Sequence, residues 1–404
     1  MRFMTMLAVY PHVQGVLLGL LACGISFLLY PPVLHFARRK NIVDNPDARK
    51  LQREPVPVLG GLVVATSFFL VMALHYMLNG TSKMLAGTVA VLVMTGMGIW
   101  DDLKNLPAAF RFVVELLVVW LLMHFGDFYI NDLHGLWGIH EIPFWVAAPL
   151  SMIAGVGIIN AVNLIDGIDG YASGYGIVAC LVFALMFYLA GTTLSAGCLM
   201  ILAGALLPFF LHNLFGKKSK MFIGDGGSLM LGAVMMVSVF GILDKDSPCS
   251  AMAADKGMSL VAFTLAVLNI PVFDTLRVMT MRMLRGNSPF NPDKTHLHHL
   301  FIEMGFSHVA TGGTLLALNF LSVVIWWVSW KLGASPDVQF YIVVAIGLLI
   351  TFVFYKFVKV QEEKQSRIYL WLCSVGERSH RFLLPAWRFV RSLVDRPVFT
   401  REKE

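Results

Sequence analysis

Two amides and two carboxylates recur at three-residue intervals in one short polar stretch, as Asn160, Asn163, Asp166 and Asp169. Residues three apart lie on the same face of a helix, so a helical arrangement would bring all four side chains together. A glycine follows each aspartate, which allows a tight turn and lets a ligand approach the backbone closely. A capped helix end followed by a polar turn is the purely structural alternative.

Two further acidic sites emerge abruptly from apolar sequence. Asp101 and Asp102 directly follow an apolar segment, and like charges this close repel each other unless a cation or solvent is nearby. Asp225 lies in a glycine-rich turn preceded by three lysines. Backbone N–H groups in such a turn suit phosphate, and the carboxylate suits a hard cation. The spacing is not that of a P-loop, so ATP hydrolysis is not implied.

The chain from 282 to 299 combines basic residues with a histidine cluster. No cysteine lies nearby and no HExxH motif is present, which argues against a zinc site. Phosphate binding is the better chemical interpretation, and a structural role for the histidines is the alternative. The residues concerned are Arg282, Arg285, Lys294, His296, His298 and His299.

The elements that must position these residues are strongly apolar. Hydrophobic residues make up 57% of the 404-residue chain and charged residues 14%, against about 25% charged in soluble domains. Apolar runs of about 18 residues or more indicate an all-α polytopic membrane protein. The first run is too long for a signal-peptide core, so we expect it to be retained. We predict eleven spans, at 13–35, 57–78, 84–100, 108–125, 143–162, 171–190, 194–214, 227–243, 257–277, 309–330 and 338–358.

The basic residues predict the orientation of these spans. All but five of the 31 Lys and Arg residues fall on one side of the predicted topology, which places the N-terminus outside and the C-terminus inside. Anionic lipid headgroups therefore explain the net charge of +6 better than nucleic acid does. The five exceptions are Arg2, Lys83, Lys245, Lys256 and Lys331.

Two segments have a distinct character outside the spans. Residues 126–142 alternate weakly around two glycines and predict a short outer β-hairpin. Residues 361–404 predict a basic amphipathic tail on the inner leaflet, broken near Pro385. We therefore divide the chain into a transmembrane domain (1–360) and this tail. The five cysteines show no ligand-like spacing, which predicts neither a disulfide framework nor a zinc site.

The predicted topology places the aspartates of five loops on the cytoplasmic face, and we expect no carboxylate near the middle of a span. Ion-coupled transporters typically bury acids there, so a secondary transporter is only a distant alternative. Mg²⁺ binds through one or two carboxylates together with substrate phosphates. The pattern predicts phosphoryl transfer at a membrane surface. The aspartates are Asp44, Asp47, Asp101, Asp102, Asp166, Asp169, Asp225, Asp274 and Asp293.

Four motifs in order also carry a family resemblance. They are Asp101-Asp102, the stretch 160–170, the turn 221–228 (Met-Phe-Ile-Gly-Asp-Gly-Gly-Ser) and the segment 288–299 (Ser-Pro-Phe-Asn-Pro-Asp-Lys-Thr-His-Leu-His-His). Together they resemble the polyprenyl-phosphate N-acetylhexosamine-1-phosphate transferases of glycosyltransferase family 4, most closely the WecA type, over about residues 15–358. The resemblance implies transfer of a sugar 1-phosphate from a UDP-N-acetylhexosamine to undecaprenyl phosphate in the bacterial inner membrane, with release of UMP.

The resemblance also implies roles for individual residues. Asp225, with Asn163, would bind Mg²⁺, for which Mn²⁺ is the alternative ion, and Asp101 and Asp102 would form the catalytic carboxylate pair. Many such enzymes form dimers, so a homodimer is one expectation. The implied substrate-binding residues are Asp44, Lys50, Asn160, Asp166, Asp169, Asn213 near the uracil, Arg282, Arg285, Lys294, His296, His298 and His299.

Some positions depart from the family pattern and leave the sugar open. Arg111 and Glu115 stand where many relatives have Lys and Gln, and Gln52 replaces a frequent His. UDP-GlcNAc is the first expectation, UDP-GalNAc or a 6-deoxy-N-acetyl sugar the alternative, and a MraY-type phospho-MurNAc-pentapeptide transferase the near alternative. An alkyl phosphate is mostly dianionic at pH 7, since its second pKa is about 6. We therefore favour direct attack of the lipid phosphate over a covalent intermediate on an aspartate.

Overall fold

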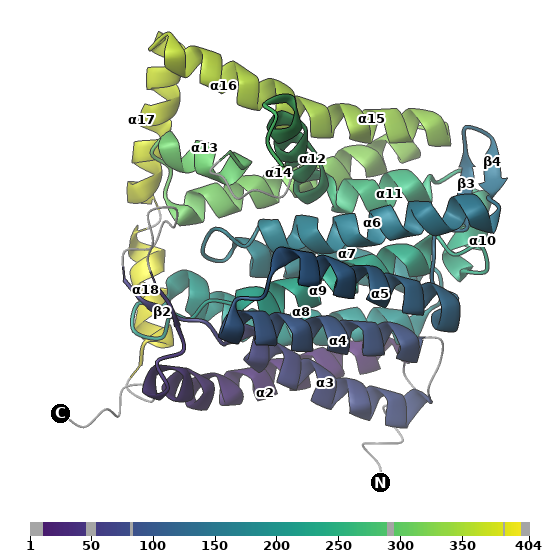
Figure 1. Cartoon of the computed structure of the whole chain (residues 1–404), viewed down its shortest axis with the longest axis horizontal. Coiled ribbons are helices and arrows are strands. Elements are labelled where there is room, and N and C mark those ends of the chain that lie inside the picture. The colour runs from purple at the N-terminus through teal and green to yellow at the C-terminus, as the bar shows by residue number, and fades with distance from the viewer. Residues whose placement is uncertain (1–10, 46–53, 81–83, 289–294, 383, 397–404) are drawn as a thin grey trace.

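The computed structural model describes residues 11–45, 54–80, 84–288, 295–382 and 384–396. Long helices lie side by side, with connections at both ends of the bundle (Figure 1). Among the described residues ten helices are long and apolar enough to cross a membrane, and one bent helix pair makes an eleventh span if its two helices are counted together. The chain is thus a mainly helical polytopic membrane protein, as predicted. Its orientation in the membrane and the division at residue 360 stay predictions.

Each predicted span corresponds to a helix or a helix pair. Shorter helices and two small sheets connect these spans. The spans are α2 (Pro11–Arg39), α3 (Gly60–Asn79), α4 (Met84–Lys104), α5 (Ala108–Gly126), α6 (Phe144–Leu164), α7 (Tyr171–Leu189), α8 (Thr193–Phe215), α9 (Gly224–Ile242), α11 (Leu260–Val267) with α12 (Asn269–Leu284), α14 (His308–Lys331), and α15 (Pro336–Leu348) continued through a π-helical segment (Leu349–Val353) into α16 (Phe354–Glu363). The remaining elements are α10 (Pro248–Lys256), α13 (Leu297–Glu303), α17 (Arg367–Phe382), α18 (Leu384–Val394), β1 (Val43–Asp44), β2 (Val56–Pro57), β3 (Asp132–Leu136) and β4 (Ile139–Glu141).

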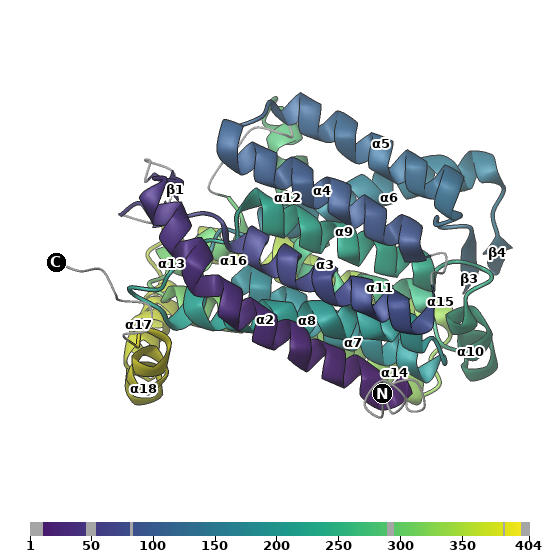
Figure 2. The same ribbon diagram turned by 90° about the horizontal axis from the view of Figure 1, so that it is seen from below.

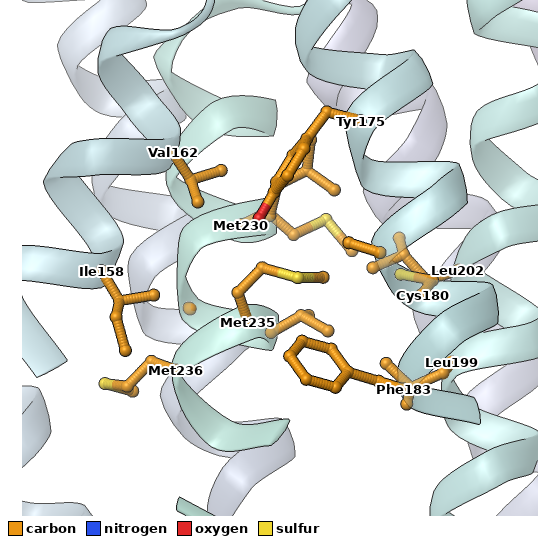
Figure 3. Packing of buried hydrophobic residues seen from close by; sticks show 14 of the residues in the cluster. Ile158, Val162, Tyr175, Cys180, Phe183, Leu199, Leu202, Met230, Met235 and Met236 are labelled. Carbon is orange, nitrogen blue, oxygen red and sulfur yellow. The ribbon is translucent and has the colours of Figure 1, made fainter. Parts of the chain in front are cut away.

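Helix α9 is the centre of the bundle. In its most apolar stretch 89% of the residues are buried, against 22–61% in the other single-helix spans. Met230, Met235 and Met236 of α9 lie between Ile158 and Val162 of α6 on one side and side chains of α7 and α8 on the other (Figure 3). Lipid tails are as apolar as these side chains, so close van der Waals packing rather than hydrophobic burial holds such helices together. Flexible methionines fill the irregular gaps.

Two glycines let neighbouring helices approach the backbone at the start of α9. A Cβ atom on Gly98 of α4 would collide with the main-chain oxygen of Asp225. A Cβ atom on Gly61 of α3 would collide with the main-chain nitrogen of Gly227. Because the obstructing atoms belong to the backbone, no side-chain rotation relieves either collision. The first turn of α9 is therefore fixed between α3 and α4.

The prediction of one continuous helix for the ninth span, 257–277, is wrong. Helices α11 and α12 form an angle of 76°, and α12 continues beyond the predicted end. Pro271 lacks the N–H group that an unbroken helix would direct to the carbonyl oxygen of Val267. Asn319 of α14 donates to that oxygen instead (2.9 Å) and accepts a hydrogen bond from the main-chain nitrogen of Ile270 (2.9 Å). The bend is thus stabilised by a side chain from another helix.

The predicted hairpin is present, since β3 and β4 pair in antiparallel fashion. Its turn residues Trp137 and Gly138 have φ values of +55° and +71°, as a type I′ turn requires. A second pair, β1 with β2, was not predicted. The hairpin lies at one end of the bundle, while α17 and α18 lie across the other end (Figure 1 and Figure 2). The position of α17 and α18 on a membrane surface stays a prediction.

The contact of Gly98 with α9 yields a test of the packing. We expect Gly98→Ala to lower the free energy of unfolding by about 1–3 kcal/mol, because the added methyl group overpacks two backbones. Gly96→Ala is the matched control, since an added Cβ there meets nothing within 4 Å and alanine favours the helix. Thermal unfolding in detergent measures both. Equal stability of the two variants would contradict the close approach of α4 to α9.

Candidate active site

A polar cavity of about 610 Å³ lies at the end of the spans opposite the hairpin. Its lining comes from β1, the end of α4, the α6–α7 turn, the α8–α9 loop, α13 and the start of α14. The cavity therefore joins segments that are far apart in the sequence and makes them one candidate site. The predicted site residues in its lining are Asp44, Asp101, Asp102, Asp166, Asp169, Asn213, Asp225 and His299.

The carboxylate of Asp102 caps the N-terminus of α9. Its Oδ1 accepts a hydrogen bond from the main-chain nitrogen of Asp225 (2.8 Å), and its Oδ2 accepts one from Gly226 (3.0 Å). The first N–H groups of a helix have no partner within the helix, and its dipole favours a negative charge there. The structure thus gives Asp102 a part in orienting Asp225, while its catalytic role stays a prediction.

Asp101 is held by a cation from the next helix. Its Oδ2 lies 2.7 Å from Nη1 of Arg111, and its Oδ1 accepts from the main-chain nitrogen of Leu106 (2.5 Å). The same guanidinium nitrogen lies 3.6 Å from Oδ2 of Asp225. Arg111 therefore supplies positive charge between the carboxylates of Asp101 and Asp225, which would otherwise repel each other. The catalytic role predicted for Asp101 also stays a prediction.

The four polar residues do not share one helix face, and the alternative of a helix end followed by a polar turn describes the structure. Helix α6 ends at Leu164, so Asn163 lies on the helix while Asp166 and Asp169 lie in the turn that follows. Gly170 closes this turn with a φ of +72°, a conformation that glycine adopts readily. Nδ2 of Asn163 donates to Oδ1 of Asp225 (2.8 Å). The turn directs the two aspartates into the cavity.

Asn160 contacts Glu115 rather than the cavity, and this contact shows that one expectation about the spans is wrong. Its side-chain nitrogen donates to Oε2 of Glu115 in α5 (2.5 Å), and it is not part of the cavity lining. Glu115 is only 2% exposed and lies within a span. The expectation that no carboxylate lies near the middle of a span is therefore incorrect. The amide of Asn160 satisfies part of the hydrogen-bonding capacity that burial would otherwise leave unmet.

Asn213 ties two walls of the cavity together. Its Oδ1 accepts a hydrogen bond from the main-chain nitrogen of Gly170 (2.6 Å), and its Nδ2 donates to the main-chain oxygen of Met221 (2.9 Å). Both ends of the amide are therefore engaged between the α6–α7 turn and the α8–α9 loop. The predicted position near a uracil stays a prediction.

The environments of Asp169 and Asp166 drive their acidities apart. Burial opposes ionisation of Asp169, but hydrogen bonds and charges from His308 and Lys220 outweigh it and lower the pKa of Asp169; Nζ of Lys220 lies 2.7 Å from Oδ2. Asp166 opens onto the cavity, yet desolvation by the surrounding protein and the charges of Asp225, Asp102 and Asp169 raise its pKa well above the ordinary value. A cation bound near Asp166 would offset the repulsion from the neighbouring carboxylates.

The histidine segment is anchored by a buried ion pair. Asp274 of α12 accepts from Nη2 of Arg277 (2.7 Å), from Nδ1 of His296 (2.9 Å) and from the main-chain nitrogen of Leu297 at the start of α13 (3.1 Å). Asp274 was counted among the loop aspartates and is instead buried in α12, as Arg277 is. His296 is thus engaged by the protein itself.

The two other histidines differ in their surroundings. Burial, with His299 and His296 as neighbours, lowers the pKa of His298, so its ring is neutral near pH 7. This ring packs against Gly167, where an added Cβ would lie 2.5 Å from Nε2. Of the three predicted histidines, His299 alone is in the cavity lining.

The remaining basic residues of the prediction do not line the cavity within the described chain. Arg282 is 8% exposed and lies in α12, and Arg285 is exposed at its end. Lys50 and Lys294 lie outside the described residues. The cations that the predicted site residues did not include are Lys220 and His308, which line the cavity, and Arg111, which contacts the cavity carboxylates Asp101 and Asp225. Arg111 and Glu115 had been noted only as departures, and His308 carried no signal in the sequence.

Comparison with known proteins supports the same region. The family model for glycosyl transferase family 4 matches residues 84–242. A protein of Escherichia coli, undecaprenyl-phosphate alpha-N-acetylglucosaminyl 1-phosphate transferase, is 31% identical over 296 residues, which cover 70% of this chain and 76% of that protein. The chain belongs to glycosyl transferase family 4.

Other relatives in the family have related names. The probable undecaprenyl-phosphate N-acetylglucosaminyl 1-phosphate transferase of Bacillus subtilis is 29% identical over 70% of this chain and 75% of its own length. The decaprenyl-phosphate N-acetylglucosaminephosphotransferase of Mycobacterium tuberculosis is 30% identical over 72% of this chain and 76% of its own. The predicted family and its WecA-like character are confirmed. The matched family region contains α4 to α9, and so the carboxylates of the cavity apart from Asp44.

The cap on α9 yields a prediction for stability. We expect Asp102→Ala to lower the free energy of unfolding by about 1–2 kcal/mol, because two helix N–H groups lose their acceptor. Asp102→Asn keeps one acceptor oxygen and should lie between the wild type and the alanine variant. Denaturant-induced unfolding in detergent measures the series. Wild-type stability of Asp102→Ala would show that the cap contributes nothing.

Proposed function

We propose that this protein transfers an N-acetylhexosamine 1-phosphate from a UDP-sugar to undecaprenyl phosphate and releases UMP. The observation that carries the proposal is the cavity, where Asp225 lies at the N-terminus of α9 among carboxylates and cations from segments far apart in the sequence. Its position at the ends of membrane-spanning helices suits a lipid whose phosphate lies at the membrane surface. GlcNAc is the proposed sugar, because the relatives' printed names specify it.

The proposed cofactor is Mg²⁺, with Mn²⁺ as the alternative. No group of three His, Cys, Asp or Glu side chains forms a ready-made metal site within the described chain. A site that offers only one or two carboxylates fits Mg²⁺, because this ion commonly takes its other ligands from water and substrate phosphates. Asp225 is the proposed ligand, since its side chain is 34% exposed to the cavity, with the adjacent Asn163 as the second proposed ligand. Asp166 is a further carboxylate of the same cavity. Bound there, the ion would neutralise charge on the pyrophosphate.

The proposed chemistry is direct displacement. An oxygen of the lipid phosphate forms a bond to the β-phosphorus of the UDP-sugar, while the bond from that phosphorus to the bridging oxygen breaks and UMP leaves. The lipid phosphate is already dianionic near neutral pH, so no strong base is required. Arg111, Lys220 and His299 supply positive charge or hydrogen-bond donors for the phosphates. A covalent intermediate on an aspartate is the competing mechanism, and retention of configuration at phosphorus would favour it.

The proposed location follows from the basic residues. The cavity lies on the side that the Lys and Arg distribution predicts to be cytoplasmic, where nucleotide sugars are made. The reaction would then take place at the inner face of the bacterial cytoplasmic membrane. It would be the first step in building a lipid-linked cell-surface glycan.

A panel of sugar donors tests the proposed reaction. We expect UMP release from UDP-GlcNAc that depends on undecaprenyl phosphate, and little release from UDP-MurNAc-pentapeptide. Purified protein in detergent, with UMP measured after each incubation, provides the readout. Preference for the pentapeptide would indicate a MraY-type enzyme. Absence of UMP release with every donor would refute the proposed function.

The metal assignment yields a separate prediction. We expect Asp225→Asn to lower kcat at least about 100-fold, because charge on the pyrophosphate is no longer neutralised. EDTA should abolish UMP release in the wild type, and added Mg²⁺ should restore it. Asp255→Asn is the control, because Asp255 is exposed on α10 at the opposite end of the bundle. Near wild-type rates for Asp225→Asn, with the fold intact, would remove Asp225 from the metal site.

A further inference from the structure

The C-terminal helix α18 packs directly on the connection that leads into the cavity. It lies across the bundle end, beside the end of α8 (Figure 1). The ring of Trp387 lies 4.6 Å from that of Phe215, measured between centroids, and Nε of Arg391 donates to the main-chain oxygen of Phe215 (3.1 Å). These two contacts dock the helix on the last residue of α8.

Asp395, immediately after α18, binds the α8–α9 loop through four hydrogen bonds. Its carboxylate accepts from the main-chain nitrogens of Lys217 (2.9 Å), Lys218 (3.2 Å) and Ser219 (2.9 Å), and from Oγ of Ser219 (2.7 Å). Three successive N–H groups converging on one carboxylate form an anion-binding nest. The hydrogen bonds outweigh the effect of burial and lower the pKa of Asp395, so the carboxylate is charged at neutral pH.

The loop segment that Asp395 binds ends at a cavity cation. Lys220 follows Ser219 directly, and its Nζ forms the 2.7 Å ion pair with Asp169. On its other side, the segment is held by Tyr30 of α2, whose hydroxyl donates to the main-chain oxygen of Ser219 (2.8 Å). Because Lys220 directly follows Ser219, loss of the four Asp395 hydrogen bonds would loosen the backbone from which its side chain reaches Asp169.

We infer that Asp395 is a positioning residue, which holds the α8–α9 loop so that Lys220 presents its ammonium to the phosphates of the nucleotide sugar. The inference rests on the proposed function, because it assigns that substrate to the cavity. It gives the C-terminal segment a part in substrate binding that is distinct from attachment to a membrane surface. The described contacts on Phe215 keep α18 docked when Asp395 is changed, so substitution there alters the loop rather than removing the helix.

Hydrogen exchange tests the contact without reference to activity. We expect the amides of 217–219 to exchange at least about fivefold faster in Asp395→Ala than in the wild type, because their acceptor is lost. Asp395→Asn keeps one acceptor oxygen and should show a smaller change. Glu377→Gln is the matched control, since Glu377 is an exposed carboxylate on α17 for which the described chain offers no hydrogen-bond partner. Equal exchange in all four proteins would overturn the inference.

Kinetics then separate positioning from a merely structural role. With UDP-GlcNAc as the varied substrate, we expect Asp395→Ala to raise KM about fivefold, the effect of losing a partly exposed charged contact. A simple loss of folded protein would instead lower the apparent kcat and leave KM unchanged. Combined with Lys220→Gln, Asp395→Ala should add little further change in KM, because both act through one group.

The outcomes have distinct meanings. Wild-type KM for Asp395→Ala, or full additivity with Lys220→Gln, would overturn the inference. If Asp395→Ala does not fold, KM is compared between Asp395→Asn and the wild type instead, and the expected rise in KM is smaller. If the wild type itself releases no UMP from UDP-GlcNAc, the proposed function fails for that donor, and the exchange experiment still decides whether Asp395 holds the loop.

Discussion

The structure depends on how the first turn of α9 is held within the bundle. A buried helix start leaves N–H groups that must find partners, and in a membrane protein water is not available to every one of them. Asp102 accepts from two of these groups, and Gly98 lets α4 come close enough for this contact. Because Asp225 is the second residue of α9, the same contacts fix the direction of its carboxylate. Packing, capping and the proposed chemistry thus converge on one turn.

Charge compensation is the second constraint, and it follows from the first. Carboxylates gathered around one helix start repel each other. Arg111 lies between Asp101 and Asp225, while Lys220 and His308 flank Asp169. These cations come from segments that are separate in the sequence, so the cavity forms only when the bundle is assembled. In the proposed reaction two of these cations, Arg111 and Lys220, also contact the substrate phosphates. The charges that stabilise the empty cavity therefore also take part in its chemistry.

Hydropathy and turn chemistry in the sequence predicted the eleven spans and the hairpin, because each depends on residues close together in the chain. The acidic motifs likewise predicted the six carboxylates that line the cavity in the described chain. The bend between α11 and α12 was missed because it depends on Asn319 in a distant helix. The role of Asp102 as a cap, the cation Arg111 and the buried pair of Asn160 with Glu115 were missed for the same reason, since each partner lies on another element. Three-residue spacing left a helix through Asp169 open as one possibility, and Gly170 closes a turn there instead.

The position of a bound Mn²⁺ ion relative to α9 tests the central claim most directly. The measurement is anomalous X-ray scattering from crystals grown with Mn²⁺ and UDP-GlcNAc. The account predicts a single strong peak at coordination distance from the carboxylate of Asp225, with Asp102 still bonded to the start of α9. A peak coordinated by Asp101 and Asp102, with Asp225 turned away, would contradict it.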